Sequence, residues 1–274
     1  MQKRGLILLY SRVKQVKKLE PNVYYYSDIA KDDFGPKPKK LKKITGNYKY
    51  NRDNFFVRLF DFVTYRLIMT PLAFIYVRLI RRTKIVNKEL LKKAKKEGVI
   101  VYANHTHAQS DAYLPNIAFF PCKVSMVVNA ANVSVPVLGN MTKAWGAMPL
   151  PEDYQSSKNF LKEVGLRLKR KGVLIIYPEA TLWPYYTSVR PFGEKAFSYP
   201  LKYGVKTYVL TTTYQTNKKG KLKTVAYIDG PFLFKEELSK EENMSYLHNL
   251  VFDTMKARSK MSTYEKIKYV EADK

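Results

Sequence analysis

The chain contains few of the residues from which redox and metal sites are built. Among its 274 residues are one cysteine, Cys122, and three histidines. A single cysteine excludes a disulfide within the chain and fits a reducing compartment. The sequence also lacks cysteines and histidines at the spacing of a zinc site. We therefore expect no metal and no bound cofactor.

Long apolar runs are also lacking. No window reaches the roughly 18 to 20 apolar residues of a membrane span, and the longest uncharged apolar run, residues 67–77, is interrupted by Pro71. Residues 5–10 form an apolar stretch that is too short for a secretory signal, and further lysines soon follow it. The sequence thus predicts a chain that is not exported and does not cross a bilayer.

Acidic residues are scarce. Asp and Glu number 23 against 49 Lys and Arg, which gives a formal net charge of +26. A positive field of this kind favours partners that carry phosphate, namely nucleic acid, anionic lipid or a phosphorylated substrate. The sequence has neither a ribonucleoprotein-type aromatic motif nor a clear helix-turn-helix signature, so we expect no nucleic-acid partner. A non-enzymatic basic protein that binds nucleic acid or anionic membrane remains an alternative.

An apolar segment is present at residues 55–80, and it ends in Arg78, Arg81 and Arg82. Pro71 is expected to kink or split this helical segment. An apolar helix with cationic ends can lie among lipid headgroups, where its arginines meet phosphates. The alternative is a helix hairpin packed on the core. We favour the membrane interpretation, which predicts peripheral or monotopic association with an anionic surface, the cytoplasmic face of the cell membrane.

Strands and helices alternate in the second part of the chain. Strand-like runs rich in β-branched residues occupy residues 99–103, 124–128, 173–177, 206–213 and 224–228, and a helical pattern covers residues 155–170. This alternation favours an α/β fold with a mixed, largely parallel central sheet flanked by helices. We expect three parts: a basic N-terminal extension at residues 1–50 with no core of its own, the membrane-docking helical segment at 51–83, and an α/β core with a C-terminal helical tail at 84–274.

The sequence NHTHAQSD runs from Asn104 to Asp111 and follows the first predicted core strand. Ligand sites in α/β sheets gather at the carboxyl ends of strands. There a neutral imidazole can take up a proton while a carboxylate fixes its tautomer and stabilises the imidazolium that forms. His107 lies four residues before Asp111, which on a helix would place both on one face. His105 lies directly at the strand end, so either histidine is a candidate base.

A second stretch, VLIIYPEATLW, consists of a strand of the buried type followed by Pro178 and Glu179. Because the carboxyl ends of parallel strands meet at one edge of a sheet, we expect the Glu179 carboxylate to share a site with the two histidines.

Together these stretches resemble the glycerolipid acyltransferases, in particular the lysophosphatidic acid acyltransferase group, over residues 99–230. The family's first block, Asn-His followed by Asp, is represented by Asn104, His105 and Asp111, with five residues instead of four between His and Asp. The third block, Pro-Glu-Gly-Thr-Arg in the family, is represented by Pro178, Glu179, Ala180, Thr181 and Leu182.

The resemblance implies an acyltransferase of phospholipid biosynthesis. Such an enzyme moves a fatty acyl group from a thioester, acyl-CoA or acyl carrier protein, to the free hydroxyl of a lysophospholipid, by default 1-acylglycerol-3-phosphate. It also implies that His105 is the general base, that Asp111 orients it, and that no acyl-enzyme intermediate forms. His107 is then expected to line the site. Another lysolipid or a glycolipid is the alternative acceptor.

The family's anchors for the acceptor phosphate are missing. Its third-block arginine is Leu182 here, and the region of its second block offers only Lys143. Arg190 and Lys195 follow the third block closely, and a cation needs only to reach the phosphate from a nearby loop. We predict substrate-binding roles for Asn104, His107, Lys143, Glu179, Thr181, Arg190 and Lys195.

Overall fold

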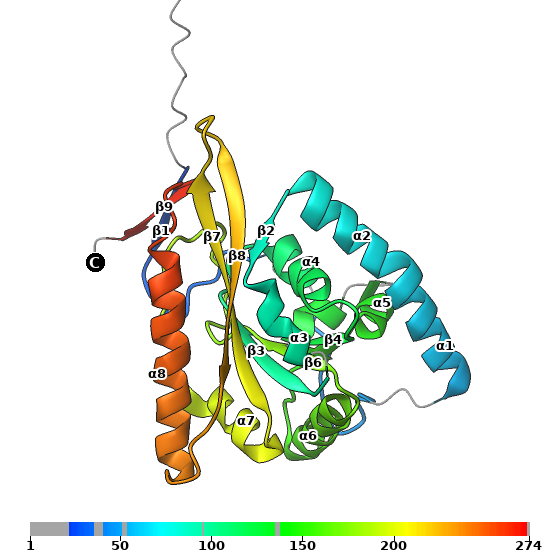
Figure 1. The fold of residues 1–274 in the computed structure, drawn as a ribbon. Helices are drawn as coiled ribbons and strands as arrows, with labels where there is room; N and C mark the ends of the chain where they lie inside the picture. The colour runs from blue at the N-terminus through cyan, green and yellow to red at the C-terminus, as the bar shows by residue number, and fades with distance from the viewer. Residues whose placement is uncertain (1–21, 36–40, 51–53, 95, 135–137, 273–274) are drawn as a thin grey trace, which may run out of the picture.

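A seven-stranded sheet forms the centre of the computed structural model, which describes residues 22–35, 41–50, 54–94, 96–134 and 138–272. The strand order is β2-β8-β7-β3-β6-β4-β5 (Figure 1). The strands are β2 (Lys84–Val86), β3 (Val99–Ala103), β4 (Val124–Val128), β5 (Ala147–Pro149), β6 (Val173–Ile176), β7 (Lys206–Thr216) and β8 (Leu222–Phe232). Every neighbouring pair in this sheet is parallel except β7 with β8. The predicted mixed, largely parallel sheet is therefore confirmed.

Helices cover both faces of the sheet. Successive side chains of a strand point to opposite faces, and in β3 residues Val99 and Val101 belong to one buried cluster while Ile100 and Tyr102 belong to the other. The helices of the core are α3 (Leu91–Ala94), α4 (Ala108–Ala118), α5 (Leu138–Ala144), α6 (Tyr154–Lys169), α7 (Ser198–Tyr203) and α8 (Lys240–Ser259). Helices α3 and α4 contribute to the first cluster, and α6 and α8 to the second. The predicted α/β class, with helices flanking the sheet, is confirmed.

The apolar segment is a single helix of 26 residues from Phe55 to Ile80. It consists of α1 (Phe55–Val63), a π-helical stretch η1 (Thr64–Met69), α2 (Thr70–Phe74) and a second π-helical stretch η2 (Ile75–Ile80). Pro71 does not split it. The amide of Thr70 bonds to the carbonyl of Tyr65 five residues back, and Pro71 lies in the first turn of α2, where a missing N–H is best tolerated. Neither a broken helix nor a hairpin is present in this segment.

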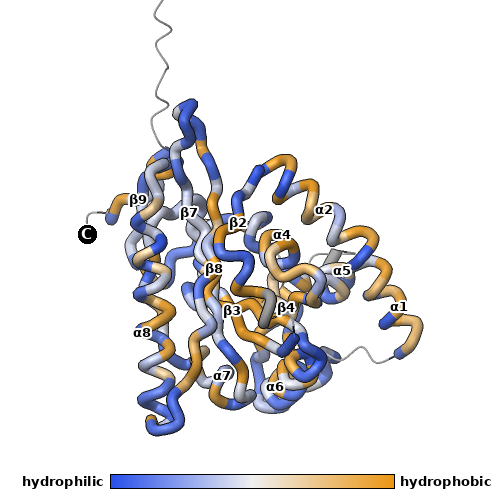
Figure 2. The backbone as a smooth tube through the Cα atoms, in the orientation of Figure 1, coloured by the Kyte–Doolittle hydropathy of each residue, from blue (hydrophilic) through white to orange (hydrophobic). Residues whose placement is uncertain are grey.

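One side of this helix packs on the core, and most of its other side chains are apolar and exposed. Tyr65, Met69, Ala73 and Val77 recur every four residues and are each at most 3% exposed. The exposed large apolar residues of the helix are Phe55, Phe56, Leu59, Phe60, Phe62, Val63, Leu67, Ile68, Leu72, Phe74, Ile75, Leu79 and Ile80. Figure 2 shows this helix, which is largely apolar, along the outer edge of the molecule. By length and composition it is able to cross a membrane, contrary to the expectation drawn from residues 67–77.

The described part of the N-terminal extension packs on the rest of the chain, which the sequence did not predict. Strand β1 (Asn22–Tyr26) pairs in parallel with β9 (Ile267–Glu271), so the two ends of the chain form a small second sheet. Ile44, Tyr48 and Tyr50 are buried in the cluster that includes α6 and α8. These residues of the extension therefore contribute to the core of the α/β unit. Its run of lysines at residues 37–43 lies partly outside the described residues.

Candidate active site

Two loops place the predicted catalytic residues at one edge of the sheet. Strands β3 and β6 are parallel neighbours, with Val99 opposite Val173 and Tyr102 opposite Ile176. The chain leaves β3 at Asn104 and leaves β6 at Tyr177, so both loops begin at the carboxyl edge. The two loops also bond to each other, because the amide of Trp183 donates to the carbonyl of His105 at 3.3 Å. Parallel pairing thus places the histidines and Glu179 in one site.

The side chains of His105 and Asp111 form a dyad. The Nδ1 atom of His105 lies 2.7 Å from Oδ2 of Asp111. The same carboxylate oxygen accepts the backbone N–H groups of Thr106 at 3.1 Å and His107 at 3.0 Å. The loop therefore wraps around the carboxylate, and this accommodates the extra residue between His105 and Asp111. The aspartate side chain is 5% exposed and the histidine 23% exposed, so the imidazole is the accessible member of the pair.

The second ring nitrogen of His105 remains available for chemistry. Its Nε2 atom makes no hydrogen bond to any residue that the structure describes. The ring of Tyr177 lies beside the imidazole, with 4.6 Å between ring centroids, and its hydroxyl donates to the backbone carbonyl of Asp111 at 2.7 Å. Tyr177 thus braces both members of the dyad. The sequence signal for it was its place at the end of a buried strand, next to Pro178.

His107 has a different environment. It is the residue that caps α4, with an extended backbone at φ −162°, and its Nδ1 accepts the amide of Ser110 at 3.3 Å. Its Nε2 lies 3.2 Å from the hydroxyl of Tyr185. Because Nδ1 accepts, Nε2 carries the proton and donates to Tyr185. Burial lowers the pKa of His107, and the nearby charge of Arg81 lowers it further. The helical spacing from His107 to Asp111 does not bring their side chains together, because His107 precedes the helix.

Glu179 and Arg190 form a buried ion pair behind the dyad. Arg190 donates to Oε2 of Glu179 from Nε at 3.0 Å and from Nη2 at 2.9 Å, and both side chains are 0% exposed. The guanidinium also donates to the hydroxyl and the carbonyl of Thr181. Burial raises the pKa of Glu179 to about 7, although the charges of Arg190 and His105 oppose this rise. Arg190 and Thr181 therefore hold the loop and Glu179 in place, and the guanidinium is engaged before any substrate arrives.

The N-terminal segment closes over the third-block loop. Leu182, at the position of the family's arginine, is 6% exposed, and its amide donates to Asp33 at 3.0 Å. The indole of Trp183 donates to the carbonyl of Asp32 at 2.7 Å. Ala180, at the position of the family's glycine, has φ +63°, a conformation that glycine adopts at least cost. The loop thus keeps the backbone conformation that a glycine would favour, although Ala180 and Leu182 stand at the positions of the family's glycine and arginine.

The side chains of three other predicted residues make their contacts away from His105 and Asp111. The amide of Asn104 bonds to both the carbonyl and the amide of Thr212 on β7, at 2.9 and 2.8 Å, and extends the β3–β7 pairing. Lys143 lies in the last turn of α5, with its ammonium 4.4 Å from the ring centroid of Tyr48. Lys195 is exposed in a short 3-10 turn, Glu194–Phe197. The binding roles predicted for these residues remain predictions.

Two cations at the mouth of the site were not predicted. Arg81 lies 5.6 Å and Lys266 3.9 Å from the ring centroid of Tyr185, the residue that meets His107. The Nε and Nη2 atoms of Arg81 are buried and have no partner among the described residues. A buried guanidinium whose N–H groups are unused favours an anionic ligand. Among the described residues, no cluster of three or more His, Cys, Asp or Glu side chains is arranged to hold a metal ion.

Comparisons with known proteins bear on the core of the chain. Residues 82–215 match the family model described as Acyltransferase. No curated protein gives a significant match. Among solved structures, the 1-acyl-sn-glycerophosphate (LPA) acyltransferase PlsC from Thermotoga maritima matches with a TM-score of 0.50 and 19% identity, over 76% of this chain and 83% of that one. At this identity the likeness concerns the fold alone. With the family match across the segment that carries the dyad and Glu179, the chain belongs to the acyltransferase family.

Proposed function

We propose that the protein transfers a fatty acyl group from acyl-CoA or acyl carrier protein to the free hydroxyl of a lysophospholipid, 1-acylglycerol-3-phosphate. The observation that carries the proposal is the dyad, in which a partly exposed His105 is held through Nδ1 by a buried Asp111. The structurally similar Thermotoga protein is a 1-acyl-sn-glycerophosphate acyltransferase, which agrees with this acceptor.

In the proposed mechanism, His105 acts through Nε2. The Nδ1–H group donates to Asp111, which leaves Nε2 with the lone pair that removes the proton of the acceptor hydroxyl. As that proton leaves, the hydroxyl oxygen attacks the thioester carbonyl. The C–S bond breaks, the imidazolium returns its proton to the departing sulfur, and the new ester is released with a free thiol. Asp111 stays ionised and stabilises the imidazolium throughout, because two backbone N–H groups hold its oxygen in place.

Membrane association is the second part of the proposal. The exposed apolar side of the helix from Phe55 to Ile80 enters the interface between headgroups and acyl chains, while the buried side stays packed on the core. The end of this helix lies at the site, because the ring of Tyr76 is 6.5 Å from that of His107. A lipid acceptor therefore has a short path from the bilayer to His105. We propose a monotopic or peripheral protein on the cytoplasmic face of the cell membrane.

Arg81 and Lys266 support a phosphorylated acceptor. They flank Tyr185 and lie near His107, and the unused N–H groups of Arg81 suit phosphate oxygens. Arg190 is engaged by Glu179, so it is a poorer candidate for this contact than the sequence suggested. We propose that Arg81 and Lys266 take the place of the family's missing arginines. Both residues lie outside the family match at residues 82–215.

An acyl-transfer assay with acceptors that differ only in headgroup tests the function. We expect transfer to 1-acylglycerol-3-phosphate with at least one thioester donor, and loss of that transfer in His105→Ala. Arg81→Met and Lys266→Met should each raise the acceptor KM about tenfold or more and leave the donor KM unchanged, since each charge-assisted contact is worth about 1.5 to 3 kcal/mol. The matched controls are Arg82→Met and Lys268→Met, which remove the same charges from neighbouring exposed positions.

The same assay separates the alternatives. Faster transfer to an unphosphorylated lysolipid or glycolipid, with no effect of Arg81→Met, would assign a different acceptor. No transfer to any lysolipid, together with tight and salt-sensitive binding of DNA, would favour the nucleic-acid alternative.

A further inference from the structure

A basic cavity lies at the edge of the sheet opposite to the candidate active site. It has a volume of about 290 Å³, and its lining includes Arg58, Tyr65, Lys123, Glu163, Arg167 and Gly172. Lys123 directly precedes β4 and Gly172 directly precedes β6, so the cavity lies at the amino edge of the sheet. The chain between Gly172 and Tyr177 spans roughly 15 Å at about 3.3 Å per residue. The cavity is therefore separate from the dyad, which lies at the carboxyl edge.

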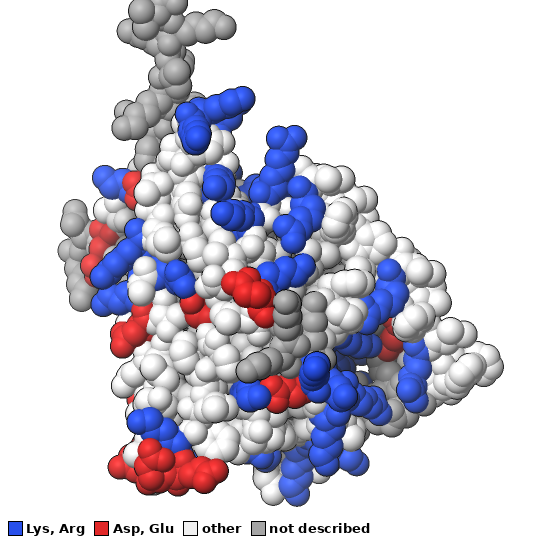
Figure 3. Space-filling view, viewed as in Figure 1, with Lys and Arg blue, Asp and Glu red and all other residues white. Residues whose placement is uncertain are grey.

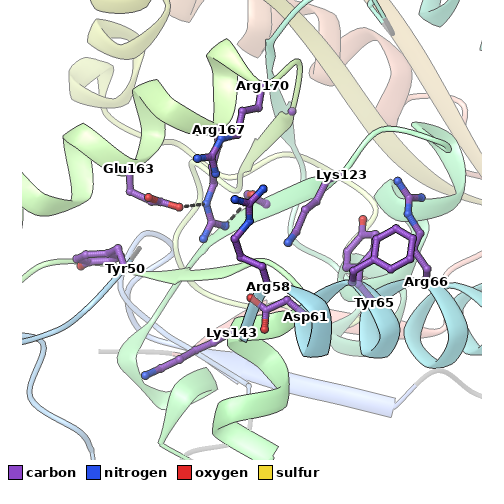
Figure 4. Close-up of a pocket in the computed structure, with 13 residues that line it drawn as sticks. Tyr50, Arg58, Asp61, Tyr65, Arg66, Lys123, Lys143, Glu163, Arg167 and Arg170 are labelled. Atoms are coloured by element: carbon purple, nitrogen blue, oxygen red, sulfur yellow. Dashed lines mark hydrogen bonds and ion pairs between the residues drawn. The ribbon is translucent and has the colours of Figure 1, made fainter. Parts of the chain in front are cut away.

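Positive charge dominates the cavity lining. Six of its residues are Lys or Arg, and two are acidic. Figure 4 shows Arg58, Lys123 and Arg167 directed from different elements toward one central space. Figure 3 shows Lys and Arg side chains around a hollow between the long helix and the body of the molecule. Cations that converge on one space repel one another, and an anion bound between them relieves this repulsion.

Parts of the cavity are held rigid before any ligand binds. Arg167 donates from Nε to Glu163 at 2.7 Å and from Nη1 to the hydroxyl of Ser125 at 2.8 Å. Arg66 donates to the carbonyl of Pro121 at 2.5 Å. The hydroxyl of Tyr65 accepts the amide of Val124 at 2.9 Å, which fixes the helix against the strand. These bonds order the wall of the cavity before a ligand binds, so binding costs less conformational entropy.

One wall of the cavity is the apolar helix itself. Arg58, Phe62 and Tyr65 come from it, and Phe62 is 60% exposed. The helix is about 39 Å long for its 26 residues, at about 1.5 Å per residue. Its first turns border the cavity, and its last turns reach the candidate active site through Tyr76. A lipid at the cavity therefore has apolar side chains beside its acyl chains and cations beside its headgroup.

We propose that this cavity binds the phosphate headgroup of an anionic phospholipid that is neither the acyl acceptor nor the product, and that this lipid fixes the protein on the membrane. The inference rests on the proposed membrane docking of the helix, but not on the acyl transfer. Phosphate suits this cavity because guanidinium groups bind its oxygens in pairs. The apolar wall and its place on the membrane-facing helix favour a lipid over free phosphate.

Vesicle co-sedimentation of the full chain tests the proposal. Vesicles of phosphatidylcholine contain the same mole fraction of either phosphatidylglycerol, which is neither acceptor nor product of the proposed reaction, or oleate, which is anionic but carries no phosphate. We expect at least tenfold tighter binding to the phosphatidylglycerol vesicles. Arg58→Gln with Lys123→Gln should weaken that binding by on the order of tenfold or more for each cation removed. The control, Lys158→Gln with Lys162→Gln, removes two exposed lysines of α6 outside the cavity and should change binding by less than about threefold.

Three results would overturn the proposal. Equal binding to the two kinds of vesicle would reduce the effect to surface charge. Unchanged binding of the Arg58 and Lys123 variant would remove the cavity from the interaction. Competition by millimolar inorganic phosphate would assign the cavity to a soluble phosphate instead of a lipid headgroup.

Two further measurements keep this test apart from the acyltransferase proposal. Thermal unfolding of each variant checks that the fold is retained. Acyl transfer to a short-chain soluble acceptor should be the same in wild type and in the Arg58 and Lys123 variant. A protein that binds as expected but transfers no acyl group would support the cavity and refute the proposed function.

Discussion

Asparagine at position 111 tests the dyad directly, because it preserves the shape of the side chain and removes its charge. In the wild type, Oδ2 of Asp111 accepts three N–H groups, from His105 and from the backbone of Thr106 and His107. An asparagine oxygen can still accept the two backbone amides, so the loop should keep its fold. The imidazolium that forms at His105 then loses the opposite charge that stabilises it.

The magnitude follows from the geometry. The Nδ1 to Oδ2 distance is 2.7 Å, and the aspartate side chain is only 5% exposed, so solvent screens the pair poorly. Unit charges about 4 Å apart attract by about 4 kcal/mol at an effective dielectric constant of about 20. A barrier raised by that amount slows the reaction about a thousandfold. We therefore expect Asp111→Asn to lower kcat by about three orders of magnitude while the acceptor KM changes little.

The assay is acyl transfer at saturating acceptor, with His105→Ala and His107→Ala measured beside it. His105→Ala should abolish nearly all transfer. His107→Ala should stay within about tenfold of wild type, because His107 bonds to Ser110 and Tyr185 through its ring and bonds to Asp111 only through its backbone. An Asp111→Asn enzyme within tenfold of wild type would refute the electrostatic reasoning. A dead His107 variant beside a normal His105 variant would reverse the assignment of the base.

Three further predictions concern stability and membrane binding. Burial raises the pKa of Glu179 from 4.5 to about 7, so between these pH values the folded state binds a proton that the unfolded state has lost. The protonated carboxyl therefore stabilises the folded state fully below about pH 4.5, and this stabilisation is lost as the pH rises to about 7. Denaturant unfolding should show a decline of up to about 3 kcal/mol across this range that Glu179→Gln lacks, and parallel curves would contradict the burial argument. Ala180→Gly should raise the unfolding free energy by about 0.5 to 1 kcal/mol, because φ is +63° there, and a destabilised variant would show that the methyl group makes a compensating contact. Phe56→Gln with Leu67→Gln should weaken vesicle binding by at least tenfold, since these side chains are 76% and 68% exposed on the helix. Tyr154→Gln, equally exposed at 76% but on α6, is the control, and an equal loss there would remove the helix from the interface.

The core of the fold could be predicted because local sequence determines it. The β-branched run at β3 is buried on both faces, as a central strand of a parallel sheet requires, and the strand ends carried the chemistry to one edge. The dyad followed from a motif of eight residues. The prediction that Glu179 shares this edge needed only that β3 and β6 run parallel.

Long-range packing could not be predicted in the same way. The loop position of Arg190 suggested that its guanidinium could bind a substrate phosphate. In the structure the side chain is fully buried and paired with Glu179, eleven residues earlier. The N-terminal residues Asp32 and Asp33 reach Trp183 and Leu182 across about 150 positions, and no periodicity records such a contact. The helical spacing that made His107 the alternative base does not apply, because the rule assumes that the helix has already begun, whereas the His107 side chain caps the first turn.

In the proposed membrane-bound state, the two basic features of the structure act together through the helix that joins them. Arg81 follows the last residue of this helix at the candidate active site, and Arg58 lies in its first turns at the cavity. A single cationic contact would leave the protein free to turn about that point on the membrane. Two contacts about 35 Å apart along the helix, at about 1.5 Å per residue, with an apolar side between them, permit one orientation. In that orientation the His105 loop stays beside the bilayer, so a lysophospholipid reaches the base without leaving the interface. Salt should then weaken membrane binding without abolishing it, because the apolar part of the contact does not depend on ionic strength.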